Sequence, residues 1–223
     1  MNEFTNLSAF IKDEEVEKIK EYGLTNNVPI IQDEGLAFLL FLTKNKNVKK
    51  VLEIGTAIGY SSINMALNND GLFIDTIERD EKMYNEALKN ISNLNLTKRI
   101  RVHFVDALEI SEEELEKDYD LIFIDAAKAQ YIKFFDKFTK LLKKGGIVFT
   151  DNLLFHGLVY GNKEDLSKNL RSLVTKIESY NDYLKNNQDF DSYFFKIGDG
   201  ISVSVKKWKR LLLITKKECS STH

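Results

Sequence analysis

From residue 51 onward, apolar residues follow two alternating patterns along the chain. Short runs rich in β-branched and aromatic residues are separated by stretches of about 12 to 16 residues with helical spacing. This alternation predicts parallel strands joined by crossover helices. The run at 121–124 is apolar on both faces, as a central strand covered by helices must be. The strand-like runs are 51–54, 72–77, 100–105, 121–124 and 147–149.

Two helical patterns fill about the first 46 residues. The second, over residues 34–43, is apolar nearly all round and predicts a buried helix. Pro29 separates the two because it favours an extended conformation at Val28. We therefore expect an N-terminal helical cap over about residues 1–46. The apolar positions of the first pattern are Phe10, Ile11, Val16 and Ile19.

After Asn152 the alternation stops and a long amphipathic helix follows, with apolar residues from Leu166 to Leu184 on one stripe. Two further strands, 193–197 and 201–205, flank Gly198-Asp199-Gly200, which is a strong hairpin signal. The pattern thus predicts an α/β fold whose seven-stranded, mostly parallel sheet ends in an antiparallel hairpin, with helices on both faces. We expect a single domain over 1–207 and assign no structure to the tail 208–223.

The composition of the 223 residues fits one globular domain, with a single proline, 43% hydrophobic and 30% charged residues. No apolar segment approaches the roughly 20 residues that span a bilayer, and Met1-Asn2-Glu3-Phe4 does not resemble a signal peptide, so we expect a cytoplasmic protein with no membrane partner. The lone Cys219 excludes an internal disulfide framework. A net charge of −2 gives no global attraction to nucleic acid.

Each of the five predicted parallel strands ends at or next to an acid. Because ligands of such sheets bind beyond the carboxyl ends of the strands, these five side chains are candidates for one site. A single acid in such a place is more often a turn or cap residue. The acids are Glu53, Glu78, Asp106, Asp125 and Asp151.

The first strand leads into a glycine turn, Gly55 to Gly59, whose spacing differs from the Gly-x-Gly-x-x-Gly that seats a pyrophosphate. A ligand without phosphates therefore fits better. Glu78 can accept bonds from a ribose, Asp106-Ala107 can contact an adenine edge, and Glu53 favours a positive charge. Together they suit S-adenosylmethionine. A hydride-transfer enzyme would use Glu78 in the same way, and Asp106 is also a candidate helix cap.

A second set of polar residues suits a metal. Asp125, Asp151 and Asn152 supply two carboxylates and an amide oxygen at neighbouring strand ends, a ligand set that fits Mg²⁺ or another divalent cation such as Mn²⁺. A cap and a loop turn explain the same residues equally well. Lys128 is a candidate base, because a neighbouring dication disfavours the charged form of an ammonium, or it is a solvated lysine at a helix start.

The motifs in this order resemble those of the metal-dependent class I O-methyltransferases, which include the catechol and caffeoyl-CoA O-methyltransferases. They are 51–61, Ile77-Glu78-Arg79, Asp106-Ala107, Phe123-Ile124-Asp125-Ala126-Ala127-Lys128 and Thr150-Asp151-Asn152. The resemblance implies a Rossmann-like methyltransferase fold, a homodimer, a metal bound by Asp125, Asp151 and Asn152, and catalysis by Lys128 and Asp125. It implies that the methyl donor is bound by Val28, Glu53, Gly55, Ser61, Glu78, Asp106, Ala107 and Asp125.

Within this family four segments most resemble the bacterial tRNA 5-hydroxyuridine methyltransferases, which make 5-methoxyuridine at the wobble position. The expected acceptor is therefore the anticodon loop of a tRNA, and the alternative is a small catechol-like molecule. Two hypotheses from other classes are a nicotinamide-dependent oxidoreductase and a nucleotide-binding module without catalysis. The four segments are 27–30, 155–159, 176–181 and 198–200.

Overall fold

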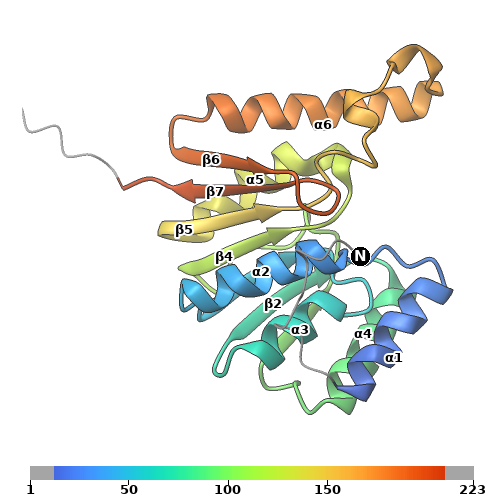
Figure 1. The fold of residues 1–223 in the computed structure, drawn as a ribbon. Helices are drawn as coiled ribbons and strands as arrows, with labels where there is room; N and C mark the ends of the chain where they lie inside the picture. The colour runs from blue at the N-terminus through green and yellow to red at the C-terminus, as the bar shows by residue number, and fades with distance from the viewer. Residues whose placement is uncertain (1–12, 209–223) are drawn as a thin grey trace, which may run out of the picture.

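A computed structural model describes residues 13–208, which form a seven-stranded sheet in the order β3-β2-β1-β4-β5-β7-β6 (Figure 1). The strands from β3 to β5 are parallel, whereas β7 is antiparallel to both of its neighbours. The predicted fold is confirmed, including the terminal hairpin. The strands are β1 (Lys50–Ile54), β2 (Phe73–Glu78), β3 (Ile100–Phe104), β4 (Tyr119–Ile124), β5 (Leu142–Thr150), β6 (Phe190–Phe195) and β7 (Ile201–Lys206).

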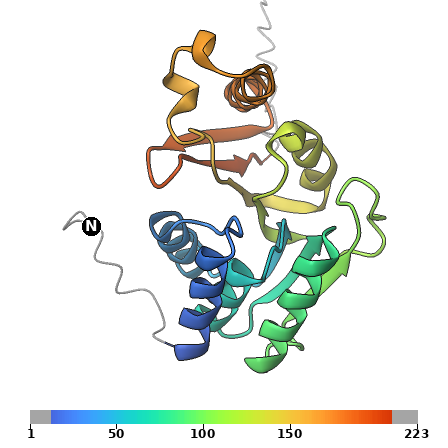
Figure 2. The same ribbon diagram turned by 90° about the vertical axis from the view of Figure 1, so that its right-hand side faces the viewer.

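Helices cover both faces of this sheet and bury one apolar cluster on each. The first four helices pack on one face, and the last two pack on the other (Figures 1 and 2). No helix within residues 13–208 is long and apolar enough to cross a membrane. The helices are α1 (Glu14–Thr25), α2 (Asp33–Asn45), α3 (Tyr60–Asn68), α4 (Glu81–Asn93), α5 (Tyr131–Phe138) and α6 (Lys168–Asn186).

The N-terminal cap consists of α1 and α2. Asp13 begins α1 by accepting hydrogen bonds from the backbone N–H groups of Glu15 and Val16. On α2, Leu36, Leu39 and Leu40 are buried but Phe41 is 55% exposed, so the helix is not buried all round as its sequence predicts. Phe10, Ile11 and the tail after Trp208 lie outside the described residues, so their predicted roles are untested.

The helix predicted between β3 and β4 is absent, since residues 105–118 contain turns and no helix, and β6 begins three residues before the predicted 193–197. Ser111 N donates to Glu114 Oε1 and Glu113 N donates to Ser111 Oγ, contacts that resemble the first turn of a helix, but no further helical turn follows them. Lys137 on α5 then holds the loop against the sheet by donating to the carbonyl oxygens of Leu108 (2.8 Å) and Ile110 (2.7 Å).

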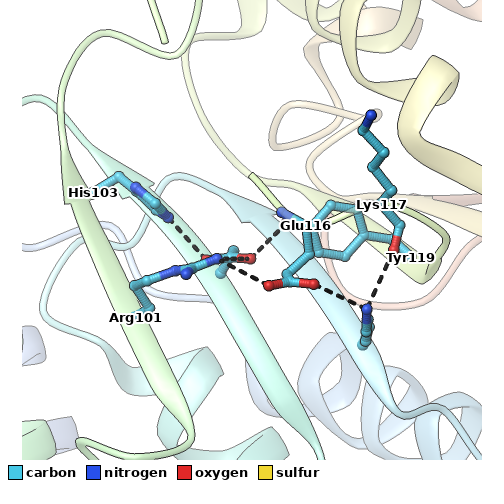
Figure 3. A network of polar contacts seen from close by, with 7 residues as sticks. Arg101, His103, Glu116, Lys117 and Tyr119 are labelled. Atoms are coloured by element: carbon cyan, nitrogen blue, oxygen red, sulfur yellow. Dashed lines mark hydrogen bonds and ion pairs between the residues drawn. The ribbon is translucent and has the colours of Figure 1, made fainter. Parts of the chain in front are cut away.

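A charged network occupies the sheet face beneath this loop (Figure 3). The fully buried carboxylate of Asp75 on β2 accepts hydrogen bonds from Arg101, His103 and Tyr119 at 2.6–3.0 Å. Arg101 also lies 3.7 Å from Glu116 in the loop. Burial alone would raise the pKa of Asp75, but its three partners outweigh that effect and lower it to about 2. The network therefore stabilises a face that lacks its crossover helix.

We predict that Asp75→Asn lowers the free energy of unfolding by roughly 2–3 kcal/mol at pH 7. Because the pKa of Asp75 is depressed in the folded state, its contribution is present above the unfolded value of about 3.9 and is lost as the pH falls towards 2. Urea unfolding at pH 7 and pH 3 measures the difference. Asp182→Asn, at an exposed carboxylate, is the control and should cost less than about 0.5 kcal/mol. An Asp75 effect that is independent of pH contradicts the prediction.

Candidate functional site

A cavity lies at the carboxyl ends of β1, β2 and β4, where the sequence predicts a binding site. Seven of the predicted site residues line it: Gly55, Ser61, Glu78, Asp106, Ala107, Asp125 and Lys128. The structure therefore brings together residues from the carboxyl ends of four strands, β1 to β4. The lining residues that were not predicted are Pro29, Ile30, Ile31, Ile54, Thr56, Ala57, Tyr60, Ile77, Arg79, Met83, Val105, Ala126, Ala127 and Phe134.

Gly55 forms the floor of the cavity at the first turn. Its φ of +102° is a conformation that side chains with a Cβ rarely adopt, and a Cβ there would lie 2.0 Å from the backbone oxygen of Asp125. The N–H groups of Gly55 and Thr56 both donate to the carbonyl oxygen of Ile77 at the end of β2. The turn thus binds β1 tightly to the ends of β2 and β4, and only glycine fits.

Glu78, the last residue of β2, binds the turn from the neighbouring strand. One carboxylate oxygen accepts a hydrogen bond from Ala57 N (2.8 Å), and the other accepts from Arg79 N and Asp80 N (both 2.8 Å). Asp106 accepts from Leu108 N and from Arg79 Nη1, and the Leu108 bond in particular lowers the pKa of Asp106. Both carboxylates are therefore fixed in place at the cavity edge.

Glu53 is fully buried and does not line the cavity, in contrast to its neighbours in the predicted donor set. Its carboxylate lies behind Ser61, whose hydroxyl donates to Oε1, and it accepts a second hydrogen bond from Thr76 Oγ1 at 2.6 Å. Burial raises the pKa of Glu53 to about 7 despite these two bonds. Any effect of Glu53 on a ligand is therefore electrostatic or acts through Ser61.

Asp125 and Asp151 lie side by side because β4 and β5 are parallel neighbours, with Ile124 paired to Thr150. Asp151 is buried, and burial together with the charge of Asp125 raises its pKa. Burial also raises the pKa of Asp125, although Lys128 opposes this. Asn152 follows at a left-handed φ of +65°, and its Nδ2 donates to Asp151 Oδ2 (2.9 Å), which leaves its amide oxygen free for another partner.

Within residues 13–208 no three His, Cys, Asp or Glu side chains are arranged to hold a metal ion. A cation here would therefore need the amide oxygen of Asn152 besides the two carboxylates. Two desolvated carboxylates that repel each other and one amide oxygen form a hard ligand set. The residues present thus fit the predicted Mg²⁺ or Mn²⁺.

The loop after Asn152 brings aromatic side chains to Lys128. The Nζ atom of Lys128 lies 5.7 Å from the centre of the Phe155 ring, and the centres of the Phe155 and His156 rings are 5.7 Å apart. Both loop residues have positive φ, and the backbone N–H of His156 donates to the buried carboxylate of Asp199. Asp199 was predicted only as part of a hairpin turn, because a Gly-Asp-Gly sequence is typical of turns.

Val28 was predicted to close over the donor, but the cavity is lined by the three residues after it, Pro29, Ile30 and Ile31. The side chain of Val28 is buried, and its N–H donates to the carbonyl oxygen of Gly23 at the end of α1. The segment between α1 and α2 therefore forms one wall of the cavity, and a direct contact of Val28 with a ligand stays a prediction.

We predict that Gly55→Ala destabilises the fold by roughly 3–5 kcal/mol, because it adds a clash with the Asp125 backbone to the strain of a positive φ. Gly71→Ala is the matched control: Gly71 also has a positive φ, +73°, but a Cβ there meets nothing within 4 Å. In Gly71→Ala, backbone strain alone should lower the free energy of unfolding by about 1–2 kcal/mol. Chemical denaturation measures both variants, and equal losses would mean that the close approach at Gly55 is unimportant.

A family model described as O-methyltransferase matches residues 4–207 of the chain. A caffeoyl-CoA O-methyltransferase of Populus kitakamiensis is 32% identical over 191 residues, which cover 82% of this chain and 80% of that protein. Tapetum-specific methyltransferase 1 of Arabidopsis thaliana is 30% identical over 190 residues, which cover 83% and 81% of the two chains.

Two solved structures have similar folds. One is a provisionally named caffeoyl-CoA O-methyltransferase from Staphylococcus aureus, 41% identical, with a TM-score of 0.83 over 87% of this chain and 93% of that one. The other is an O-methyltransferase from Bacillus cereus in complex with S-adenosylhomocysteine (SAH), 27% identical, with a TM-score of 0.76 over 88% and 92% of the two chains.

Proposed function

The chain belongs to the O-methyltransferase family, and we propose that it transfers a methyl group from S-adenosylmethionine to a hydroxyl group of tRNA 5-hydroxyuridine with the aid of a divalent cation. The enzyme class predicted from the sequence, an S-adenosylmethionine-dependent O-methyltransferase, is thereby confirmed. One observation supports the proposal of metal-dependent transfer to tRNA. A cavity suited to the donor lies at the same edge of the sheet as Asp125, Asp151 and Asn152.

The cavity suits a nucleoside with a cationic tail. Glu78 lines the cavity and accepts hydrogen bonds only from backbone N–H groups, so its remaining lone pairs are available to ribose hydroxyls. Asp106 and Ala107 would contact the adenine, and Met83 and Phe134 supply apolar surface. The sulfonium end would then face Ser61 and Asp125. The glycine turn offers no phosphate cradle, which argues against the nicotinamide-dependent oxidoreductase.

Asp125, Asp151 and Asn152 would hold the cation. When bound, a divalent ion polarises two vicinal acceptor oxygens and lowers the pKa of the hydroxyl that is to be methylated. The side chains themselves orient this site: Tyr131 donates from its hydroxyl to the carbonyl oxygen of Asp151 (3.1 Å), and the amide of Asn152 holds the Asp151 carboxylate. Lys128 lies beside Asp125 at the cavity lining, where it can receive the acceptor's proton or hold the resulting oxyanion.

Metal chelation does not by itself select the acceptor, since 5-hydroxyuracil and a catechol both present two adjacent oxygens. The loop residues Phe155 and His156 favour the nucleotide, because aromatic rings beside a lysine suit a base splayed out of an RNA loop. Two partly buried lysines give no support to a phosphate contact, because backbone oxygens already engage their ammonium groups. Lys137 is engaged with loop carbonyl oxygens, and Lys206 at the end of β7 donates to Thr139 O and Leu142 O. A small catechol-like molecule remains the second candidate.

We predict that the protein labels tRNA containing 5-hydroxyuridine when incubated with methyl-labelled S-adenosylmethionine and Mg²⁺. Digestion of the tRNA should place the label at the wobble uridine. Unmodified tRNA, which lacks the hydroxyl, and a simple catechol are incubated in parallel as controls. Label only on the catechol overturns the tRNA proposal and keeps the methyltransferase.

We predict that Asp151→Ala lowers the rate of methyl transfer at least about 100-fold, as the loss of a polarising group does at other active sites. S-adenosylmethionine should still bind. The reason is that Asp151 does not line the donor cavity. Calorimetric titration gives donor affinity, and the labelling assay gives turnover. The control is Asp182→Asn on the exposed side of α6. Full turnover of the wild-type protein in excess chelator would contradict the role of a cation.

The homodimer implied by the resemblance stays a prediction. Exposed aromatic side chains on α2 and β6 provide apolar surface for such a contact, among them Phe41 (55% exposed) and Tyr193 (56%). Phe38 links the two elements, since its ring lies 6.3 Å from that of Phe41 and 5.0 Å from that of Phe195. The cytoplasmic location likewise stays a prediction.

A further inference from the structure

Glu53 connects two separate parts of the cavity wall through its carboxylate. Ser61, at the start of α3, donates to one oxygen, and Thr76 on β2 donates to the other at 2.6 Å. Thr76 in turn shares a 2.6 Å hydrogen bond with Thr56. Ser61 and Thr56 line the cavity, whereas Glu53 and Thr76 are fully buried behind them.

The direction of these hydrogen bonds follows from the number of protons that the hydroxyl groups can donate. A hydroxyl carries one proton, so Thr76 cannot donate to both Glu53 and Thr56. While Thr76 donates to the Glu53 carboxylate, Thr56 must donate to Thr76. The chain therefore points all of its protons towards Glu53, which is the arrangement that stabilises an ionised carboxylate in a buried place.

We propose that Thr76 is a positioning residue for the methyl donor: its hydroxyl keeps Glu53 ionised and oriented behind Ser61 and Thr56, so that Glu53 serves as a counter-charge for the cationic end of the donor. This inference rests on the proposed function only in the identity of the donor. Thr76 itself touches no ligand, because it does not line the cavity. A threonine within a strand is otherwise explained by β-propensity alone.

The electrostatic surroundings of Glu53 make this support necessary. Burial raises its pKa to about 7, and Ser61 and Thr76 oppose the rise with their hydrogen bonds. The charged group facing it is Asp125, at the end of β4, which raises the pKa further. Glu53 is therefore close to losing its charge near neutral pH. Loss of one of the hydroxyl donors moves the pKa upwards and leaves a larger neutral fraction.

The test compares Thr76→Val, which removes the hydroxyl and keeps the shape, with Thr76→Ser, which keeps the hydroxyl. Calorimetric titration measures the affinity of each full-length protein for S-adenosylmethionine between pH 6 and pH 9. A hydrogen bond to a charged group is worth enough to shift the pKa by about one unit or more. Thr76→Val should therefore bind the donor about tenfold more weakly at pH 6, with the difference closing towards pH 9. Thr76→Ser should resemble the wild type.

The ligand's own titration does not disturb this comparison, because the ratio of two affinities at one pH cancels it. Thr43→Val is the matched control, since Thr43 is also fully buried, does not line the cavity, and bonds only to Leu40 O and Asn69 Nδ2. It should bind the donor as the wild type does at every pH. Thr76→Ala replaces Thr76→Val if thermal unfolding shows that the valine is not tolerated.

Titration with S-adenosylhomocysteine shows which cationic group of the donor Glu53 attracts, because this ligand keeps the ammonium group and lacks the sulfonium. A loss shared by both ligands supports the proposal with the ammonium as the partner of Glu53, and a loss larger for S-adenosylmethionine supports it with the sulfonium. A Thr76→Val loss that is equal at all pH values, or no loss, overturns the proposal. If the wild-type protein binds neither ligand, the proposed function itself fails.

Discussion

The convergence of parallel strands brings more negative charge to one edge of the sheet than a desolvated place tolerates. Glu53, Asp125 and Asp151 all lie at that edge with raised pKa values, because burial and mutual repulsion oppose their ionisation. Such groups either take up protons or bind cations. A sulfonium donor and a divalent ion are two cations that can share the edge, and a methyl transfer to a chelated oxygen needs both of them there.

Other parts of the fold keep this edge in register. Gly55 lets β1 approach the end of β4, and Glu78 fixes the turn by accepting a hydrogen bond from Ala57 N. On the far side of the sheet Asp75 ties β2 and β3 to the loop that replaces a crossover helix. These contacts join residues distant in sequence, so the site depends on the whole parallel sheet rather than on one loop.

Much of this could be predicted from the sequence, and the limits have physical causes. Strand ends are visible as apolar runs that stop at an acid, so the sequence alone assigns Glu78 and Asp125 to one edge of the sheet. The missing helix before β4 was not predictable, since the segment has helical spacing and even makes the Ser111–Glu114 contact that is typical of the start of a helix. The hydrogen bond from Thr76 to Glu53 was not predictable, because a contact between neighbouring strands leaves no pattern in the sequence.

The most direct measurement is a crystal structure grown with S-adenosylhomocysteine and Mn²⁺, with data collected where manganese scatters anomalously. We expect one anomalous peak bounded by Asp125, Asp151 and Asn152, and the ribose of the nucleoside hydrogen-bonded to Glu78. A peak elsewhere, or an adenosyl group outside the cavity, would contradict the claim that two cations share this edge.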